Sequence, residues 1–467
     1  MTTTASHSFR PLLIAAVLSF LPMLNLYYVG EEAIFPITSM EMWQHGAWLK
    51  QYLYGGDVQH NPLFNWLIIV FANLFGWPHV LEVARGLTIC ATLATAAVLS
   101  WLAWRLFRER SFAVFAALIY LTFNDVLMYH GWLAYVDPLF ALFIFTAIAA
   151  LWVACAEQRR GLLWVAAIAL TCALLSKAFT AYVFYGAALV VLARNRTYRG
   201  LLFSPMSLLA HAAMLLAPLL WFALIPAGHS QSGRMFGEIL AKLAFPGIGA
   251  YLAKLLLYPL EIWSGLLPAG VLVIYFALRR RITQIETQPE HFRSALLIVM
   301  LNFLPYWLAP YSGVRYLMPI YPLFALIAAR LIWRAGLPAV STTRRWLAAA
   351  IALSFVLGLL AFPYYQQQFR GANYAQAAAD IIARTQGQPL YVTDSTAAGL
   401  NVTAYINQLR YPQQALQFPP EKLDTGFIIA RTPDSTPGEI VREYQLGGDR
   451  LYLLCRGTAC KPGLPIN

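Results

Sequence analysis

The sequence predicts an all-helical polytopic membrane protein with a small polar α/β domain at its C-terminal end. Of the 467 residues, 60% are hydrophobic and 12% are charged, and the mean hydropathy is +0.59. An average soluble domain carries about 25% charged residues. Apolar runs of about 18 residues or more, long enough to cross a bilayer as a helix, recur along the chain. A transmembrane β-barrel would show short alternating segments instead.

The apolar runs predict roughly eleven to thirteen hydrophobic helices in residues 1–365. Pro62–Phe75 is short for a span and is expected to be a re-entrant or surface helix. The first run is too long for the core of a signal peptide and is expected to be an uncleaved span. The expected helices are Pro11–Val29, Val80–Leu106, Phe112–Tyr129, Leu139–Ala156, Leu162–Leu175, Ala178–Ala193, Met206–Ile225, Leu255–Leu278, Ser294–Ala309, Tyr316–Trp333 and Trp346–Tyr364.

The longest polar stretch near the N-terminus is residues 27–63, which follow the first apolar run directly. This loop begins with two adjacent carboxylates, Glu31 and Glu32, and ends in His60-Asn61-Pro62-Leu63. Between them, Glu41–Leu53 places Trp, Tyr and Leu side chains near one helical face. Because Trp and Tyr favour the headgroup level, this segment is expected to be an amphipathic helix in the membrane plane.

Basic residues are unevenly distributed between alternate loops. Arginine groups follow several apolar runs on one side, whereas the opposite loops carry fewer basic residues. The positive-inside rule then places the N-terminus in the cytoplasm, and the 27–63 loop and the C-terminal region outside. This topology accounts for the net charge of +12, so no nucleic-acid partner is expected.

Residues 366–467 are more polar and are expected to form a small extracytoplasmic α/β domain. Cys455 and Cys460 lie close together in this region, and an oxidising compartment would permit a disulfide, although two free thiols remain an alternative. The expected elements are helices at Asn373–Arg384 and Thr396–Gln408 and strands at Pro389–Thr393, Thr425–Ala430 and Arg450–Cys455.

Carboxylates on the outer side are the first candidate catalytic groups. Glu31 and Glu32 near a low-dielectric region favour a raised pKa or a cationic partner, which is how a general base is made. The alternative is a solvated helix end. Asp137-Pro138 opens a helix on the same side, where the carboxylate is either functional or an N-cap.

Cationic side chains on the same side are candidate phosphate ligands. Lys177 interrupts an apolar stretch, and the alternative to phosphate binding is a lysine that extends to the membrane surface. Arg315-Tyr316 follows an outer loop, where a guanidinium suits a lipid phosphate. His60 closes the first loop. Together with the carboxylates, these residues suit a negatively charged lipid carrier and a hydroxyl acceptor, and no metal-ligand spacing is present.

These motifs resemble the membrane glycosyltransferases of the C-type fold, which include the protein O-mannosyltransferases and the lipid A aminoarabinose transferases. That family has an acidic pair after its first span and a closing Lys- or His-Pro-Pro-Leu-type motif. The matching positions are Glu31-Glu32, His60-Asn61-Pro62-Leu63 with Asn65-Trp66, Asp137-Pro138, Ser176-Lys177 and Arg315-Tyr316-Leu317-Met318-Pro319.

The resemblance implies inverting sugar transfer from a polyprenyl-phosphate donor, such as undecaprenyl phosphate, to an envelope acceptor at the periplasmic face of a bacterial inner membrane. The acceptor is lipid A, another glycan or a protein. Glu31 or Glu32 would act as the base and Asp137 would orient the acceptor, a ligand or the loop. Lys177, Arg315, Tyr316 and His60 would bind the donor phosphate.

Two positions depart from the family pattern. Glu31 replaces the usual Asp, so either acid of the pair could be the base. His60 replaces a lysine, so a phosphate role would require a protonated imidazole. A divalent cation at the carboxylates stays open. The competing interpretations are a flippase for the same lipid and a structural subunit of an envelope complex.

Overall fold

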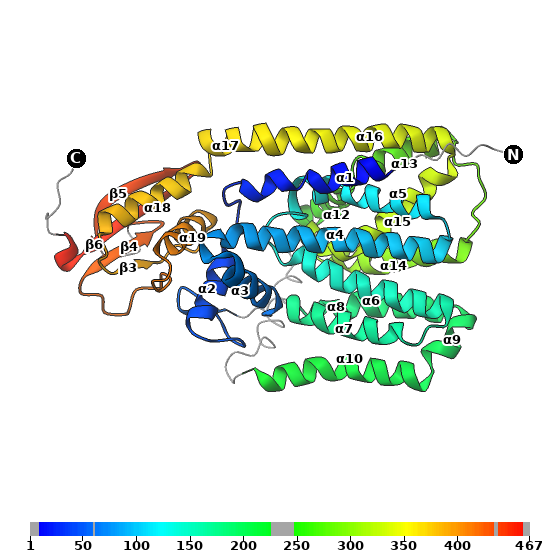
Figure 1. The fold of residues 1–467 in the computed structure, drawn as a ribbon, viewed down its shortest axis with the longest axis horizontal. Coiled ribbons are helices and arrows are strands. Elements are labelled where there is room, and N and C mark those ends of the chain that lie inside the picture. The colour runs from blue at the N-terminus through cyan, green and yellow to red at the C-terminus, as the bar shows by residue number, and fades with distance from the viewer. Residues whose placement is uncertain (1–8, 59–60, 226–246, 434–437, 461–467) are drawn as a thin grey trace. The chain divides into compact units, whose positions relative to one another are not determined.

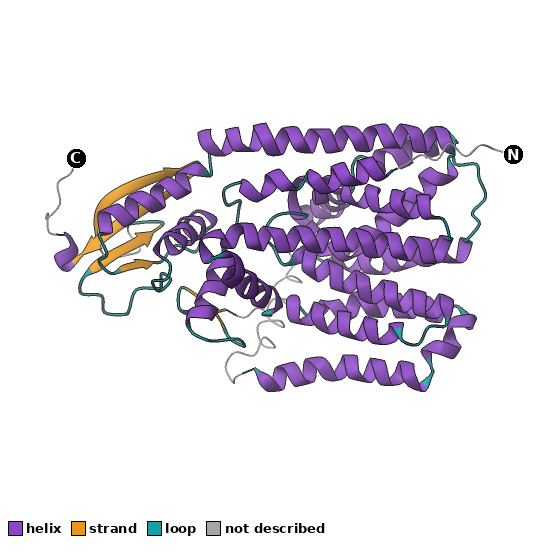
Figure 2. Cartoon of the chain, viewed as in Figure 1, coloured by secondary structure: helices purple, strands orange, loops and turns teal. Residues whose placement is uncertain are grey.

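The structure is a computed structural model that describes residues 9–58, 61–225, 247–433 and 438–460. Within these ranges, five helices are long and apolar enough to cross a bilayer, or six if one sharply bent helix pair counts as a single span. Five shorter apolar helices of 10–17 residues accompany them. Figures 1 and 2 show that helices dominate and that the strands lie mainly near the C-terminal end of the chain. The chain is therefore a multi-pass membrane protein with a small sheet, as predicted.

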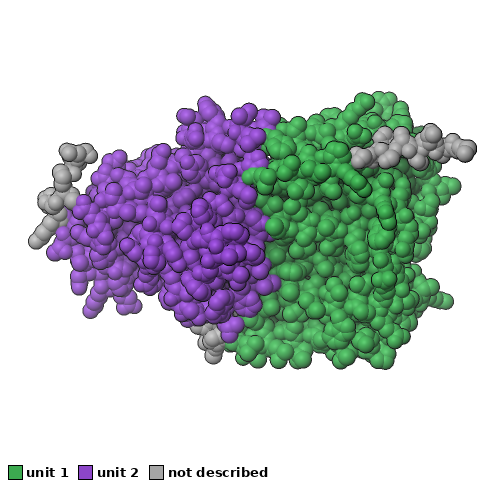
Figure 3. All heavy atoms as spheres, in the orientation of Figure 1, with its two compact units in different colours: residues 1–21, 88–132, 136–355 green, residues 22–87, 133–135, 356–467 purple. Residues whose placement is uncertain are grey.

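The chain forms two compact units, coloured separately in Figure 3. Unit 1 comprises Met1–Leu21, Thr88–Trp132 and Val136–Phe355. Unit 2 comprises Pro22–Leu87, Leu133–Tyr135 and Val356–Asn467. The 27–63 loop and the C-terminal region thus belong to the same unit, although they are distant in sequence.

Unit 1 is a helical bundle. Helix α6 packs along α7 and also contacts α8, and most of α6 is buried inside the protein, whereas α10 is mainly exposed. Both helices are apolar on all sides. Helix α6 packs among other helices, whereas the exposed surface of α10 faces lipid. The elements are α1 (Arg10–Leu18), α4 (Val80–Phe107, whose first turns lie in unit 2), α5 (Arg110–Leu121), the π-helical turn η3 (Val126–His130), α6 (Asp137–Glu157), α7 (Leu162–Ser176), α8 (Thr180–Ala193), α9 (Arg196–Leu202), α10 (Pro205–Leu224), α12 (Ile248–Gly265), α13 (Ala269–Leu278), α14 (Pro289–Leu308), the 3₁₀ helix η4 (Val314–Ile320), α15 (Tyr321–Arg334) and α16 (Leu337–Val356).

Unit 2 combines the 27–63 loop with a four-stranded sheet. The strand order is β3-β4-β6-β5, with β3 and β4 parallel and the other pairs antiparallel. Leu423, Ile428, Ala430 and Leu454 form an apolar cluster of this domain. The elements are η1 (Leu21–Asn25), α2 (Ile34–Gln44), β1 (Gln51–Leu53), β2 (Gly56–Val58), α3 (Leu63–Phe75), η2 (Trp77–His79), η5 (Leu357–Ala361), α17 (Phe362–Gln368), α18 (Ala372–Thr385), β3 (Leu390–Val392), α19 (Ala397–Arg410), β4 (Gly426–Ala430), β5 (Glu439–Leu446), β6 (Asp449–Arg456) and η6 (Gly457–Cys460).

The C-terminal elements agree with the sequence prediction except for one strand. Both predicted helices and all three predicted strands are present, and Cys455 and Cys460 form a disulfide. Strand β5 was not predicted because it lies at the edge of the sheet and exposes most of its side chains. An exposed edge strand carries little of the apolar alternation that marks a strand in a sequence.

The predicted interfacial helix at Glu41–Leu53 is wrong beyond Gln44. Helix α2 ends at Gln44, and the chain then forms the antiparallel hairpin β1–β2. The buried Glu41 carboxylate accepts the backbone N–H groups of Tyr54 and Gly55 at 2.7 and 2.8 Å. This long-range pairing turns the chain back on α2, and helical periodicity alone cannot reveal it.

The helix predicted at Leu255–Leu278 is not continuous in the structure. Helices α12 and α13 are bent by 102° relative to each other. Pro268 stands at the break and lacks the N–H that would continue the hydrogen-bond ladder. Likewise, the span expected at Phe112–Tyr129 ends at Leu121 and is followed by the π-helical turn η3.

Candidate functional site

Glu32 is fully buried and is paired with Arg85. Two Arg85 nitrogens donate to the Glu32 carboxylate at 2.9 and 2.7 Å, and neither side chain is exposed to solvent. The backbone N–H groups of Val29 and Ala134 add hydrogen bonds of 2.8 and 2.7 Å. Removing one partner from such a buried pair leaves an uncompensated charge. The buried Glu32–Arg85 ion pair therefore stabilises the loop, and each side chain compensates the charge of the other.

Arg85 was not among the residues singled out from the sequence. Beyond Glu32, its guanidinium donates to the carbonyl oxygens of Met23, Leu26 and Tyr27 at 3.0, 2.5 and 2.9 Å. A signal existed, because an arginine inside the apolar run that begins at Val80 is costly and needs a partner. Arg85 ties α4 to the segment that precedes Glu32.

Glu31 has a different environment from its neighbour. It is exposed, and its backbone N–H donates to the Tyr135 hydroxyl at 3.2 Å. Its carboxylate makes no hydrogen bond or ion pair with the described residues. Residues 30–33 form a turn, which we call the acidic turn. Of its two carboxylates, Glu31 is the one available to a ligand.

Asp137, Lys177 and Tyr316 meet in unit 1. Asp137 is the first residue of α6, with Pro138 in the first turn, and its side chain forms an ion pair with Lys177 rather than an N-cap hydrogen bond. Lys177 ends α7, and its ammonium nitrogen lies 4.8 Å from the centre of the Tyr316 ring. The Arg315 guanidinium lies 5.7 Å from the same ring. We call these four residues the Lys177 cluster.

The Lys177 cluster has charges of both signs, with Asp137 buried and the other three residues half-buried. Asp137 is 5% exposed, and the positive charges of both Lys177 and Arg315 act on it. A lysine ammonium has three N–H donors, so Lys177 can contact Asp137 and a second anion together. The cluster can therefore bind an anionic group without first releasing its carboxylate.

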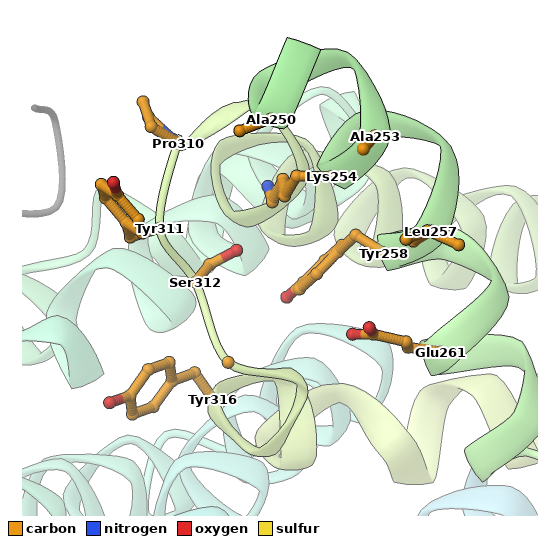
Figure 4. Close-up of a pocket in the computed structure, with 11 residues that line it drawn as sticks. Ala250, Ala253, Lys254, Leu257, Tyr258, Glu261, Pro310, Tyr311, Ser312 and Tyr316 are labelled. Atoms are coloured by element: carbon orange, nitrogen blue, oxygen red, sulfur yellow. The ribbon is translucent and has the colours of Figure 1, made fainter. Parts of the chain in front are cut away.

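A cavity of about 670 Å³ in unit 1 is lined by Tyr316 of this cluster. Figure 4 shows Lys254, Tyr258 and Glu261 of α12 on one side and the segment carrying Ser312 on the other. The Lys254 ammonium donates to the carbonyl oxygen of Tyr306 at 2.7 Å and lies 4.4 Å from the centre of the Tyr258 ring. The remaining lining residues are Ala250, Ala253, Leu257, Pro310, Tyr311 and Gly313. The cavity thus combines apolar walls with a few polar groups, as ligand sites do.

A second polar group in unit 1 joins Asp125, His130 and Tyr321. His130 Nδ1 lies 2.6 Å from Asp125 Oδ1, and the Tyr321 hydroxyl donates to Asp125 Oδ2 at 3.0 Å. The three residues link η3 to the first residue of α15, which directly follows the helix carrying Arg315 and Tyr316. Asp125 and His130 were not singled out from the sequence, because the hydrogen bond that joins Asp125 to Tyr321 spans 196 positions.

The closing motif of the first loop is only partly described. His60 lies outside the described residues, so its phosphate role stays a prediction. Asn65 of α3 donates to Thr38 and Ser39 of α2 at 2.7 and 2.9 Å. The Trp66 indole donates to the Trp48 carbonyl at 2.7 Å. These hydrogen bonds connect α3 to the 27–63 loop.

The predicted site residues therefore form two groups. The acidic turn with Glu31 and Glu32 belongs to unit 2, and the Lys177 cluster belongs to unit 1. Among the described residues, potential metal-ligating side chains gather at Glu439, Cys455 and Cys460, where the disulfide leaves no thiolate. A divalent cation at the acidic turn stays a prediction.

Comparisons with known proteins bear on the family. The sequence model of the dolichyl-phosphate-mannose-protein mannosyltransferase family matches residues 36–231. The undecaprenyl phosphate-alpha-4-amino-4-deoxy-L-arabinose arabinosyl transferases of Pectobacterium carotovorum and Pectobacterium atrosepticum are 27% and 28% identical to the chain, over 70% and 74% of its length. The chain covers 59% and 62% of the length of these relatives.

The fold agrees with a solved structure over nearly the whole chain. The crystal structure of ArnT from Cupriavidus metallidurans bound to undecaprenyl phosphate matches with a TM-score of 0.68 and 16% identity, covering 98% of this chain and all of that one. Its apo form matches with a TM-score of 0.66 at 16% identity, over 96% of this chain and 97% of that one. The chain thus has the C-type membrane glycosyltransferase fold. The matching family model and the two relatives agree with the resemblance to the protein O-mannosyltransferases and the aminoarabinose transferases noted in the sequence.

Proposed function

We propose that the protein is an inverting glycosyltransferase that moves a sugar from an undecaprenyl-phosphate donor to an acceptor of the bacterial envelope. Lipid A is the first acceptor to test, because the sequence motifs resemble the lipid A aminoarabinose transferases and the named relatives transfer an aminoarabinose from undecaprenyl phosphate. Another glycan or a protein remains an acceptor within the same proposal. The single observation that carries it is the Lys177 cluster, where a partly buried ammonium lies beside a tyrosine that lines a cavity of about 670 Å³.

Lys177 and Arg315 bind the donor phosphate in this proposal. As the bond between the anomeric carbon and the phosphate oxygen breaks, its electron pair leaves with the phosphate, whose negative charge grows. Fixed cations at that position stabilise the transition state more than the ground state. Asp137 pairs with the Lys177 ammonium, and the ring of Tyr316, which lines the cavity, lies beside that ammonium. His60, where it is protonated, would add a further charge.

Glu31 acts as the general base in this proposal. Its carboxylate takes the proton of the acceptor hydroxyl while that oxygen forms a bond to the anomeric carbon, opposite the departing phosphate. The support is its exposure and the absence of a carboxylate partner among the described residues, in contrast to the fully bonded Glu32. We therefore assign the base to Glu31 and a structural role to Glu32.

The proposed location is the bacterial inner membrane, with a cytoplasmic N-terminus and a periplasmic C-terminal domain. The uneven distribution of arginines between alternate loops supports this orientation. The acceptor would then be modified on the periplasmic side.

The decisive experiment is an assay of the purified protein in detergent. Supplied with an undecaprenyl-phosphate-linked sugar and lipid A, the protein is expected to form a new glycosidic bond, detected by mass spectrometry, without any membrane gradient. A flippase would give no product in detergent. Envelope glycans and proteins, offered in parallel, identify the acceptor.

A further inference from the structure

The peptide group between Gly30 and Glu31 is fixed from both sides within unit 2. Its carbonyl oxygen accepts a hydrogen bond of 3.1 Å from the Asn401 side chain of α19. Its N–H donates to the Tyr135 hydroxyl at 3.2 Å. The Glu31 side chain is attached to the Cα atom that follows this peptide group. The two hydrogen bonds therefore set the direction in which the side chain extends from the backbone.

The backbone at Gly30 makes this arrangement specific. Gly30 has φ of +59°, a left-handed conformation that glycine adopts without strain. A Cβ atom at this position would lie 3.0 Å from the Tyr135 hydroxyl. The close approach of Tyr135 to the acidic turn therefore needs glycine before Glu31.

The segment immediately before Gly30 is held by the same C-terminal region. The Gln366 amide accepts the Tyr27 N–H at 2.9 Å and donates to the Tyr27 carbonyl at 3.0 Å. The Tyr405 hydroxyl of α19 accepts the Tyr28 N–H at 3.3 Å. Buried or partly buried side chains from α17 and α19 thus bind the backbone of successive residues that lead into the acidic turn.

Asn401 connects α19 to this loop. The residue has no exposed surface, and its amide donates to Gly30, 371 positions away in the chain. Asn407, two turns later on the same helix, shows the ordinary alternative: it is 3% exposed and accepts the Leu416 N–H at 2.9 Å inside the C-terminal domain.

We propose that the C-terminal α/β domain positions the acidic turn, with Asn401 as the positioning residue that orients Glu31. This inference rests on the proposed function only in its choice of Glu31 as the base. The domain then has a role in the reaction without touching the reacting atoms. Loss of one positioning bond is expected to misplace the carboxylate, and small displacements of a catalytic group can cost up to about 10²-fold in rate.

The test compares Asn401→Ala with the matched control Asn407→Ala in the full-length protein. Asn401→Ala is expected to lower kcat by about 10- to 100-fold and to leave the KM for the donor lipid unchanged. Asn407→Ala is expected to lower stability by a similar amount and to leave kcat within about twofold of wild type. Equal kcat values for the two variants, or a wild-type kcat for folded Asn401→Ala, would overturn the proposal.

Two further measurements separate positioning from general damage. Combined with Glu31→Gln, Asn401→Ala should reduce kcat little further, because the group it positions is gone. Hydrogen exchange of residues 27–33 should accelerate in Asn401→Ala and in Gln366→Met, which each lose hydrogen bonds to this segment. It should not accelerate in Asn407→Ala. Unchanged exchange in both variants refutes positioning even if no transfer is detected, whereas an active Glu31→Gln refutes the base assignment alone.

Discussion

Two adjacent glutamates, Glu31 and Glu32, have different environments in the folded chain. Glu32 is enclosed by four hydrogen-bond donors and the Arg85 charge, whereas Glu31 is exposed. A carboxylate whose oxygens are already bonded has little capacity left for a substrate proton, and an unbonded one keeps it. This difference supports the separate roles proposed for two residues of identical chemistry.

Glu31→Gln should abolish most of the transfer activity and leave the fold intact. The amide cannot take a proton, and general-base catalysis contributes typically about 10²–10⁴-fold. The measurement is kcat for sugar transfer in detergent, together with a thermal unfolding curve. A Glu31→Gln protein with near wild-type kcat would remove Glu31 from the reaction.

Arg85→Met and Glu32→Gln should each destabilise unit 2. Breaking one side of a buried ion pair costs roughly 3–5 kcal/mol, because the remaining charge is left without compensation. The double variant Arg85→Met/Glu32→Gln should therefore lose less stability than the two single losses added together. Thermal unfolding of the four proteins measures this coupling, and strict additivity would contradict the paired role.

Arg315→Ala should weaken binding of the donor lipid. Its guanidinium is expected to contact the phosphate, and a charged hydrogen bond is worth roughly 1.5–3 kcal/mol, which is about 10- to 150-fold in affinity. The measurement is the Kd for undecaprenyl phosphate. Arg293→Ala, an exposed arginine of unit 1 paired with Glu290, is the control. An unchanged Kd for Arg315→Ala would exclude it from the phosphate site.

At the scale of elements, the hairpin β1–β2 depends on one buried carboxylate. Glu41 of α2 accepts two backbone N–H groups at the hairpin turn. Burial raises the pKa of Glu41 from its usual 4.5 to about 7, although the N–H groups of Gly55 and Tyr54 and the nearby His45 act in the opposite direction. The turn thus contains a carboxyl group that titrates near neutral pH.

Stability of unit 2 should fall as the pH rises from about 4.5 to 7. In this window the unfolded chain has lost the Glu41 proton and the folded chain still holds it, so raising the pH favours unfolding, by up to about 3 kcal/mol. Thermal unfolding across this range should show the decline, and Glu41→Gln should flatten it. Glu443→Gln, at an exposed carboxylate paired with Arg450, should keep the decline. The same slope in Glu41→Gln would contradict this origin.

At the scale of the whole molecule, the proposed topology places both the 27–63 loop and the C-terminal domain outside the cytoplasm. A reporter that folds only in the periplasm should be active when fused after Asn467, and a reporter that folds only in the cytoplasm should not. The opposite pattern would invert the assigned orientation. The Cys455–Cys460 disulfide fits an oxidising compartment.

Much of the helical framework could be predicted because lipid imposes a simple rule on sequence. Helices α4, α6 and α10, which are long enough to cross a bilayer, begin and end within one or two residues of the predicted ranges, since a spanning helix must be apolar over its length. The bend before Ala269 and the hairpin after Gln44 were not predicted. Both depend on local backbone chemistry and on long-range hydrogen bonds, which an apolar profile does not record.

For the candidate site too, some features follow from the sequence and others only from the tertiary structure. The sequence by itself determined the class of fold, the presence of a small C-terminal domain and the residue types at the site, because apolar length, charge placement and short motifs are local properties. Only the tertiary structure decided that Arg85 pairs with Glu32 across 53 positions, that Lys177 pairs with Asp137 across 40, and that Asn401 reaches Gly30. These pairings depend on which buried polar groups meet when the chain folds, because each buried group must find a partner to offset the loss of water.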